Sequence, residues 1–444
     1  MSLKEVPPQR WWRFALWSAL YLGWVAWLGN AWFLLGEAVV FDACVTQKVH
    51  WRFWRKRGAV KQGAVREWID AIIFAVVVVT FINIFFFQAF KIPSSSMEST
   101  LYTGDHLFVS KLAYGPRIPQ TPLTIPFTHN VLPSGKKSYS TLIQNKYRRL
   151  KGWGEVQRGD IVVFCFPNGD TVLTKMPAAD YYAVVRATSR EYAIRKWGPV
   201  MVHPSDKKDH YVKRCVGLPG DTLVLRDAQL YVNGERFSDP EGMQLCYSVF
   251  TGGTKINAKV LQQIGVNLSE VYFSPVLPGY VHMALTKPML EKIQALPNVT
   301  GTELELEKAG EDGGDIEIFP FDNSLGWTRD DFGPLQVPKK GQTIPLTRGN
   351  LPLYRRLITS YEGHALEEKD GQIFIDGKEA QTYTFAMDYF FMMGDNRHNS
   401  LDSRYWGFVP EDHIVGKPRV IWLSTDKNRS FPNNIRWRRF LKFV

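Results

Sequence analysis

Four serines stand close together directly after a long apolar run: Ser94, Ser95 and Ser96 are consecutive, and Ser99 follows three residues later. A serine hydroxyl is a weak nucleophile until a neighbouring base removes its proton. A run of serines is therefore most often a turn or a linker, and it becomes a catalytic candidate only if the chain also supplies a base. Spacing alone does not decide which of these serines would attack a substrate.

A candidate base lies in the strand-like stretch YVKRCVGLPGD, residues 211–221. Alternation along a strand places Tyr211, Lys213 and Cys215 on one face. Burial in apolar surroundings penalises an ammonium group and lowers the pKa of a lysine, so that its neutral amine can act as a base near neutral pH. Taken by itself, the stretch favours a surface strand whose lysine is exposed.

A third polar segment, MMGDNRHNSLDSRYWGFVP, covers residues 392–410. Gly394, Asp395 and Asn396 are typical of a tight turn, and the Ser400 hydroxyl can orient an amine. Asp402 and Arg404 have the spacing of an ion pair, which would also suit an ordinary solvated loop.

Metal and redox chemistry find little support in the sequence. The nine histidines form no HExxH or similar metal-ligand pattern, and we predict neither a metal nor another cofactor. The four cysteines show no CxxC spacing, so neither a zinc site nor a disulfide framework is predicted, although one bridge is left open; they are Cys44, Cys165, Cys215 and Cys246.

Two segments near the N-terminus, residues 14–36 and 71–90, contain no Asp, Glu, Lys or Arg. Each is long enough to cross a hydrocarbon core, which requires about 20 helical residues. We therefore predict two transmembrane helices. A cleaved signal peptide is the alternative for the first segment, and a buried helix of a soluble protein is the alternative for the second.

The distribution of positive charge predicts the orientation of these helices. The segment 37–70 is rich in lysine and arginine, whereas residues 1–13 contain only Lys4, Arg10 and Arg13. The positive-inside rule therefore places residues 37–70 in the cytoplasm, and residues 1–13 and the chain after residue 91 on the other side of the membrane. The basic residues between the spans are Lys48, Arg52, Arg55, Lys56, Arg57, Lys61 and Arg66.

The formal net charge of +11 indicates a polyanionic partner. Beside two predicted spans, an anionic lipid bilayer explains this charge better than nucleic acid, which we do not expect as a partner. The tail at residues 429–444 mixes arginines with aromatic residues, as interfacial segments do, although a solvated terminus fits as well. No oligomeric state follows from the sequence.

The chain beyond the predicted spans is dominated by short apolar runs separated by glycine and proline, which predicts a mainly β domain. Asn233-Gly234 and Asp376-Gly377 are typical of hairpin turns. Residues 238–370 differ, with one predicted helix at 287–296 and polar, glycine-rich connections. The predicted fold is thus a mainly β soluble catalytic domain, residues 91–237 and 371–428, with a second, inserted lobe and two N-terminal transmembrane helices.

Five sequence segments together resemble bacterial type I signal peptidases. They are IPSSSM, GDHLFVSKLAYG, RGDIVVFCFP, YVKRCVGLPGD and MMGDNRHNSLDSRYWGFVP, and they occur in the family's order after two apolar runs. The resemblance covers residues 60–115, 157–167, 210–234 and 385–425. Any single segment is weak evidence, whereas five in order are a specific signal.

The resemblance implies particular roles for residues that spacing could not assign. Ser96, which precedes Met97, matches the family's nucleophile, and Lys213 matches its general base. The Ser96 backbone N–H and the Ser94 hydroxyl match the oxyanion hole. Ser400 matches the residue that orients the lysine, and the remaining matches are the supporting pair Asp402 and Arg404 and the substrate-pocket residues Ile92, Tyr211 and Val212.

The resemblance also implies an activity, which is the removal of signal peptides from secreted preproteins by cleavage after a small residue in a small-x-small site. Ser96 lies six residues after Phe90, a distance of at most about 20 Å, so the site is expected near the bilayer surface. Three departures from the common family pattern affect the second lobe and access to the cleft: His398, Cys215 and the long excursions between the segments.

Three other functions are compatible with parts of the sequence. A serine hydrolase could use His398 or His210 as its base. A lysine-dependent protease could cleave a regulatory partner, as self-cleaving SOS repressors do, but those are soluble DNA-binding proteins. A catalytically inactive membrane receptor for signal peptides or partner proteins would lack the nucleophile, the base or the oxyanion serine, and all three matching positions are occupied here.

Overall fold

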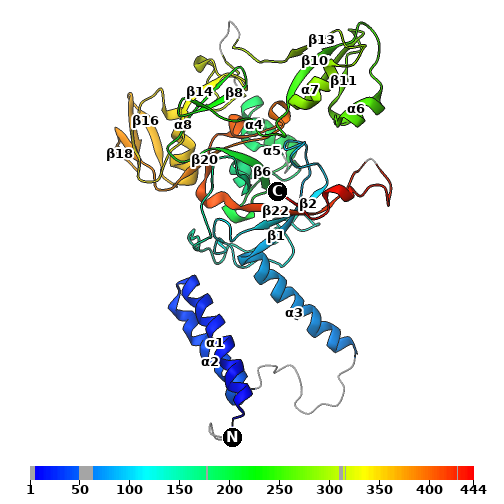
Figure 1. Cartoon of the computed structure of the whole chain (residues 1–444). Helices are drawn as coiled ribbons and strands as arrows, with labels where there is room; N and C mark the ends of the chain where they lie inside the picture. The colour runs from blue at the N-terminus through cyan, green and yellow to red at the C-terminus, as the bar shows by residue number, and fades with distance from the viewer. Residues whose placement is uncertain (1–5, 50–63, 177–178, 310–313, 316, 428) are drawn as a thin grey trace.

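The computed structural model describes residues 6–49, 64–176, 179–309, 314–315, 317–427 and 429–444. Helices α1, α2 and α3 lie at one end of the molecule, and a mainly β body lies at the other (Figure 1). Most of the predicted basic residues between the spans, from Arg52 to Lys61, lie outside the described residues. The prediction of a mainly β domain is confirmed.

The first predicted span is not a single helix. Helix α1 runs from Pro8 to Leu28, and its C-terminal cap Gly29 adopts a left-handed conformation with φ 61°. The Asn30 side chain then caps a 3-10 turn, Ala31–Gly36, which continues into α2, Glu37–Phe41, and a π turn, Asp42–Thr46. A glycine that stops one helix, followed by an asparagine that starts the next, reverses the chain inside an uncharged run. The predicted boundaries 14–36 are therefore wrong.

The segment after this reversal packs back along α1. The ring of Phe41 lies 5.3 Å from that of Phe14, and the Tyr21 hydroxyl donates a hydrogen bond of 2.7 Å to the Phe33 carbonyl. Residues 8–46 therefore form a helical hairpin (Figure 1). The predicted cytoplasmic loop 37–70 thus contains α2, the π turn and the start of α3.

Helix α3, Ala64–Phe85, is the helix of the described chain that is long and apolar enough to cross a membrane. It begins seven residues before the predicted span 71–90 and ends five residues before the span's predicted end, because Phe87–Lys91 form strand β1. The catalytic serine candidate thus follows a strand rather than the helix itself.

The C-terminal ends of α1 and α3 pack against each other. The rings of Trp24 and Trp27 lie 6.0 and 6.1 Å from that of Phe85, and the Trp27 indole N–H donates to the Lys151 carbonyl at 2.9 Å. Both helices therefore run towards the β body. The predicted pair of spans, connected directly by a cytoplasmic loop, would instead run in opposite directions.

The main sheet is antiparallel and collects strands from the whole length of the chain. Its order is β1-β2-β22-β3-β6-β20-β21, with β23 paired to β22, so that β1 and β21 are its edge strands. The bounds are β1 Phe87–Lys91, β2 Asp105–Ser110, β22 Ile414–Ser424, β3 Ile161–Cys165, β6 His210–Gly217, β20 Tyr389–Met393, β21 Val409–Pro410 and β23 Lys442–Phe443.

Smaller sheets surround this one. The predicted turns at Asn233-Gly234 and Asp376-Gly377 are confirmed, because each joins two paired strands. The strands are β7 Thr222–Arg226, β8 Gln229–Val232, β9 Glu235–Arg236, β14 Phe332–Gln336, β16 Leu366–Lys369, β17 Gln372–Ile375 and β18 Lys378–Glu379; further pairs are β15 Thr343–Pro345 with β19 Thr382–Thr384, and β4 Thr171–Leu173 with β5 Val200–Val202. The β body also contains helices α4 Tyr181–Ala187, α5 Arg190–Trp197, α8 Leu351–Arg356 and α9 Ser403–Trp406.

Residues 245–304 form a separate four-stranded sheet that projects from the body (Figure 1). Its elements are β10 Leu245–Phe250, β11 Tyr272–Phe273, β12 Tyr280–Leu285, β13 Gly301–Leu304, α6 Ala258–Ile264 and α7 Lys287–Gln294, and they share their own apolar core. The predicted helix at 287–296 corresponds to α7.

The predicted lobe 238–370 is therefore too long. Phe332, Leu335 and Tyr354 pack in the largest core together with Phe391 and Phe408 of the catalytic domain. The polar connections within residues 238–370 predicted a single lobe, but the apolar residues of this range are divided between two cores. Sequence composition does not show which core an apolar residue joins.

The C-terminal tail packs on the β body instead of lying free. The Arg439 guanidinium pairs with the fully buried Asp105 carboxylate at 2.5 Å, and its Nη2 also donates to the Thr100 carbonyl at 3.0 Å. Strand β23 adds to the edge of β22. Trp437, Phe440 and Phe443 remain exposed on this tail.

Candidate active site

The serine run lies on a loop whose two ends are fastened together. The Ile92 N–H donates to the Asp105 carbonyl, and the Gly104 N–H donates to the Ile92 carbonyl, at 2.8 and 2.9 Å. Met97 and Leu101, on the same loop, are almost completely buried. These contacts hold the backbone around Ser96 in place while its side chain stays partly exposed.

Lys213 reaches Ser96 from strand β6. Its Nζ donates a hydrogen bond of 2.5 Å to the Ser96 Oγ, and its side chain is 2% exposed. The pKa of Lys213 is lowered to about 8, chiefly by burial; the Asp402 and Asp395 carboxylates oppose this shift, whereas the Arg404 guanidinium adds to it. A substantial fraction of the amine is therefore neutral near pH 8, as a general base requires.

The turn after β20 positions the serine loop. The Asn396 N–H donates to the Ser96 carbonyl at 3.1 Å, and its Nδ2 donates to the Ser95 carbonyl at 3.2 Å. A Cβ at Gly394 would lie 2.2 Å from the Ser400 Oγ and 2.6 Å from the Ser96 carbonyl oxygen. Only glycine allows the turn to approach the serine loop this closely.

Asp402 and Arg404 form a buried ion pair behind this turn. The Asp402 carboxylate accepts from Arg404 Nε and Nη2 at 2.9 and 2.8 Å and from the Gly394 N–H at 3.0 Å. The two opposite charges offset each other, so the pair supports the turn without supplying a net charge to Lys213.

Ser400 is brought to the same place, next to Gly394, and it is buried. Its hydroxyl has no hydrogen-bond partner within the described residues. A hydrogen bond between Ser400 and the Lys213 amine, which the predicted orienting role requires, is thus not formed in this structure. That role stays a prediction.

The predicted oxyanion donors lie on the serine loop. Ser94 is exposed two residues before Ser96, and the Ser96 N–H makes no backbone hydrogen bond to any residue of the described chain. Both groups are therefore free to meet a substrate carbonyl. Ile92 and Val212 belong to the same apolar cluster as Met97, whereas Tyr211 packs on the rings of Phe166 and Trp406 at 4.5 and 5.6 Å.

Sequence reasoning missed a second ion pair beside the dyad. Arg214 donates to both oxygens of Asp395 at 2.7 Å, and the Thr100 hydroxyl donates to the same carboxylate at 2.6 Å. Asp395 is fully buried. The pair joins β6, the turn after β20 and the serine loop. A charged residue next to Lys213 within an apolar strand was the available signal.

Sequence reasoning also missed two carboxyl groups near the serine loop. Glu98 Oε2 and Glu270 Oε1 are buried and have no hydrogen-bond partner within the described residues. Burial and the charge of Glu270 raise the pKa of Glu98 to about 7. Asn396 Nδ2 donates to the other Glu270 oxygen at 2.9 Å, so the projecting sheet's segment contacts the catalytic turn.

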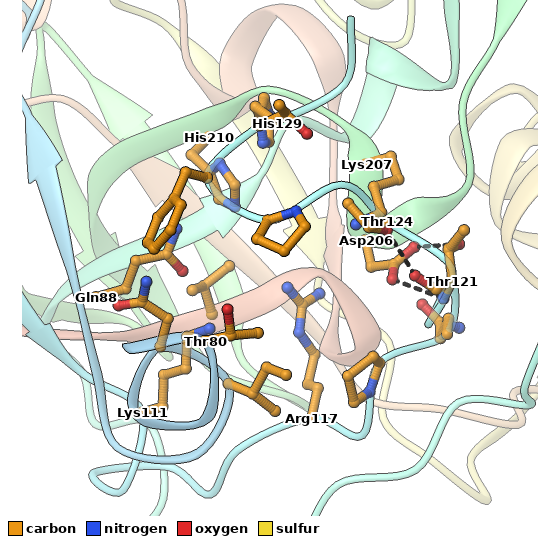
Figure 2. A pocket seen from close by; sticks show the side chains of 18 of the residues that line it. Thr80, Gln88, Lys111, Arg117, Thr121, Thr124, His129, Asp206, Lys207 and His210 are labelled. Atoms are coloured by element: carbon orange, nitrogen blue, oxygen red, sulfur yellow. Dashed lines mark hydrogen bonds between the residues drawn. The ribbon is translucent and has the colours of Figure 1, made fainter. Parts of the chain in front are cut away.

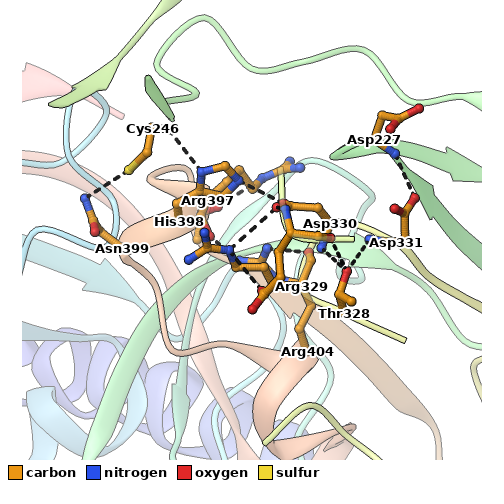
Figure 3. Close-up of polar contacts among 12 residues, drawn as sticks. Asp227, Cys246, Thr328, Arg329, Asp330, Asp331, Arg397, His398, Asn399 and Arg404 are labelled. Atoms are coloured by element: carbon orange, nitrogen blue, oxygen red, sulfur yellow. Dashed lines mark hydrogen bonds and ion pairs between the residues drawn. The ribbon is translucent and has the colours of Figure 1, made fainter. Parts of the chain in front are cut away.

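His398 connects three segments, as Figure 3 shows. Its Nδ1 accepts from the Cys246 backbone N–H at 3.1 Å, so its Nε2 carries the proton and donates to the Asp330 carboxylate at 2.8 Å. Both ring nitrogens are thereby occupied in holding strand β10 and residue 330 to the catalytic turn. This arrangement argues against His398 as a catalytic base.

The other candidate histidine lies outside the dyad. The His210 ring packs against those of Phe90 and His129 at 4.9 and 4.6 Å, and burial holds its pKa well below the ordinary value. The four cysteines are free thiols, and no group of three potential metal ligands gathers within the described residues.

Comparison with known proteins gives one consistent result. A model of the family described as "Signal peptidase, peptidase S26" matches residues 65–245 and 340–423, more than half of the chain. The two matched ranges flank a stretch that contains most of the projecting sheet.

Several curated relatives are named Signal peptidase I. The chain is 26% identical over 361 residues to that of Buchnera aphidicola subsp. Acyrthosiphon pisum, which covers 81% of this chain and 75% of the relative. It is 25% identical over 386 residues to that of Haemophilus influenzae (85% and 75%) and over 389 residues to that of Helicobacter pylori strain J99 (85% and 91%). The chain therefore belongs to the signal peptidase family, peptidase S26.

Proposed function

We propose that this peptidase is a membrane-bound serine endopeptidase that removes N-terminal signal peptides from secreted preproteins through a Ser96/Lys213 dyad. The observation that carries the proposal is the hydrogen bond from the buried Lys213 amine to the Ser96 hydroxyl. The names of the relatives supply the substrate class, because each is a Signal peptidase I. No other serine of the run has such a partner in the described chain.

In the proposed reaction, neutral Lys213 accepts the Ser96 proton while the Ser96 Oγ attacks the carbonyl carbon after a small residue. The Ser96 N–H and the Ser94 hydroxyl donate to the developing oxyanion. The lysine ammonium then protonates the amine of the departing mature chain, which leaves the signal peptide as an ester on Ser96. A water molecule, deprotonated by the same lysine, hydrolyses that ester.

The substrate groove in this proposal uses the free edge of β1, which pairs only with β2. An extended peptide can add to such an edge through backbone hydrogen bonds. Ile92 follows β1, and Val212 lies one residue before Lys213, so both side chains would line the space for a small residue beside Ser96. Large side chains would meet these walls, which accounts for a small-x-small preference.

The membrane anchor in the proposal is the N-terminal region, with the catalytic domain on the extracytoplasmic side of the bacterial cytoplasmic membrane. The helical hairpin revises the predicted topology. Arg10 and Arg13 in the first turns of α1, Lys48 after the π turn and Arg66 in the first turn of α3 lie at corresponding ends of their segments, because α1 and α3 run in the same direction. The positive-inside rule then puts the N-terminus in the cytoplasm as well.

Cysteine accessibility tests this topology. In a Cys44→Ser background, Gln9→Cys should react with a membrane-impermeant maleimide only after the cells are permeabilised. Glu379→Cys, on the exposed strand β18, should react without permeabilisation. Labelling of Gln9→Cys in intact spheroplasts would contradict this topology and support the extracytoplasmic N-terminus predicted from the sequence.

Cleavage of a model preprotein in lipid tests the function. The Ser96→Ala and Lys213→Ala variants should each bind the preprotein but fail to process it. Retained turnover in either variant would contradict the proposed dyad. The competing membrane receptor predicts binding without cleavage by the wild-type protein. Wild-type cleavage that disappears in both variants therefore separates the two functions.

A further inference from the structure

A pocket of about 570 Å³ opens between the end of α3, strand β1 and the segment 117–129 (Figure 2). Thr80 and Asn83 line it from the last turns of α3, and Gln88 lines it from β1. His210, three residues before Lys213 on β6, lines the opposite wall. The pocket therefore lies beside β6, which carries Lys213, and beside β1, which leads into the serine loop, on the side of α3.

Four cations line this pocket: Lys91, Lys111, Arg117 and Lys207. Within the described part of the chain, no carboxylate lies within ion-pair distance of any of them. The one carboxylate in the lining, Asp206, accepts hydrogen bonds from the Thr121 N–H and hydroxyl at 2.9 Å each. The pocket thus carries an excess of positive charge.

The guanidinium of Arg117 is held in place from behind. It donates to the Asp412 backbone carbonyl at 2.6 Å and to the Cys165 sulfur at 3.4 Å. In Figure 2 its guanidinium lies in the middle of the lining, between Lys111 on one side and Lys207 on the other. A fixed arginine with unpaired charge is pre-organised to bind an oxyanion.

The lysines show that the positive charges repel one another. Burial, together with the charges of Arg117 and Lys207, lowers the pKa of Lys111 to about 7. Burial also lowers the pKa of Lys207, where Asp206 acts in the opposite direction and Arg117 in the same direction. His210 stays neutral near pH 7, because its pKa is also strongly lowered. An anion in the pocket would relieve this repulsion, which the one carboxylate of the lining, Asp206, offsets only in part.

The position of the pocket indicates where the anion comes from. Thr80, Asn83 and Ile84 belong to the C-terminal turns of the helix proposed to span the membrane, so the pocket lies at the level of the extracytoplasmic headgroups. Ile125 and Phe127, both exposed, supply apolar surface at the same lining. A phosphate ester with attached acyl chains fits this combination of cations and apolar rim better than a free ion.

We propose that this pocket binds the phosphate group of an anionic phospholipid of the phosphatidylglycerol type and thereby holds β1 and β6 at the bilayer surface. The inference rests on the proposed membrane position of α3. Bound lipid would fix Gln88 and His210, and with them strand β1, which leads into the serine loop, and strand β6, which carries Lys213. Cleavage should therefore be faster in a bilayer that contains the anionic lipid.

Lipid binding can be measured independently of cleavage. In neutral detergent, short-chain phosphatidylglycerol should raise the melting temperature of the full-length protein, whereas short-chain phosphatidylcholine should not. The double variant Lys111→Gln/Lys207→Gln should lose this rise, and Lys207→Gln alone should lose part of it. Inorganic phosphate that stabilises the wild type as much as the lipid does would overturn the lipid assignment in favour of a free-anion site.

Cleavage supplies the second measurement. Wild-type protein in vesicles of phosphatidylcholine with phosphatidylglycerol should cleave a model preprotein with a KM roughly 25-fold lower than in phosphatidylcholine alone, since each of the two lysines, Lys111 and Lys207, contributes about fivefold near an anionic surface. The lipid ratio, defined as the KM in phosphatidylcholine alone divided by the KM in the mixed vesicles, should approach one in the double variant. The matched control Lys146→Gln/Lys151→Gln removes two exposed cations near the contact with α1 and should keep the wild-type ratio.

Two results would overturn the proposal. An unchanged lipid ratio in the double variant would show that general surface potential, and not the pocket, attracts the protein. A ratio that depends on acidic residues in the substrate rather than on the lipid would assign the pocket to the signal peptide. Absence of cleavage in every lipid would instead contradict the proposed function, while the melting measurement would still report on the pocket.

Discussion

Two buried lysines five residues apart differ in what surrounds their amines. Lys208 and Lys213 are 4% and 2% exposed, and burial lowers the pKa of each to about 8. The Lys208 Nζ donates to the His413 ring at 2.8 Å and to the Pro167 carbonyl at 3.1 Å. The Lys213 Nζ donates to the Ser96 hydroxyl, on a loop open to solvent.

The comparison shows that a lowered pKa does not by itself identify a catalytic base. His413 also pairs with Asp412 at 2.5 Å, so Lys208 ends a closed network that connects three segments of the fold. The pKa of Lys213 is lowered to the same value, but its partner is Ser96, the proposed nucleophile, which lies beside the proposed oxyanion donors. Access and partner, rather than pKa, separate the structural lysine from the proposed catalytic one.

The largest expected effect is a loss of turnover, which tests whether the two lysines differ in their role. Lys213→Met keeps the length of the side chain but removes the amine, so kcat/KM for a model preprotein should fall by at least about 10³-fold. Lys208→Met, the matched control, removes an equally buried amine away from Ser96 and should retain most of the activity. Equal losses in the two variants would contradict the distinction.

The next largest effect concerns the free donors around Ser96. Ser94→Ala removes one proposed oxyanion donor and should lower kcat by about 10²–10³-fold with little change in KM. Steady-state kinetics on a preprotein in detergent measures both constants. A change in KM alone would assign Ser94 to substrate binding.

The pH dependence of cleavage sharpens the comparison further. The base must be neutral, and Lys213 is protonated below its pKa of about 8, so kcat/KM should fall about tenfold per pH unit below pH 8 and level off above it. Lys208→Met should leave the inflection in place. A value of kcat/KM that stays unchanged between about pH 6 and about pH 8 would argue against lysine as the base.

The smallest expected effect is on stability. Both pKa values are lowered to about 8, so replacing either lysine by methionine removes a similar ionisation cost. Only Lys208→Met leaves His413 and the Pro167 carbonyl without their donor. Lys208→Met should therefore be less stable than Lys213→Met by about 1–3 kcal/mol, measured by urea unfolding in detergent at pH 7.

The same measurement has a pH dependence with a definite sign. A lysine whose folded-state pKa is lowered binds its proton more readily when unfolded, so the wild-type free energy of unfolding should rise between pH 8 and about 10.5. Each methionine variant should lose its share of that rise.

Much of the fold could be predicted from local patterns. Short apolar runs predicted the β domain, and Asn233-Gly234 and Asp376-Gly377 predicted two hairpins, because these turns need residues that accept positive φ. The span prediction failed at Gly29, since an average over an uncharged run does not register one glycine and one asparagine that reverse the chain. The predicted C-terminal boundary of the lobe, at residue 370, was wrong because amino-acid composition does not show which core an apolar residue joins.

The sequence by itself determined which groups are present: the ordered segments that carry Ser96, Lys213 and the Asp402–Arg404 pair. Only the tertiary structure decided what those groups can do. It set the contact between residues 96 and 213, the pairing of Arg214 with Asp395 and the closed network around Lys208. It also gathered Lys111, Arg117 and Lys207 from separate segments into one pocket. The physical reason is that burial and neighbouring charges, which set a pKa and leave a donor free or paired, arise only when distant strands come into register.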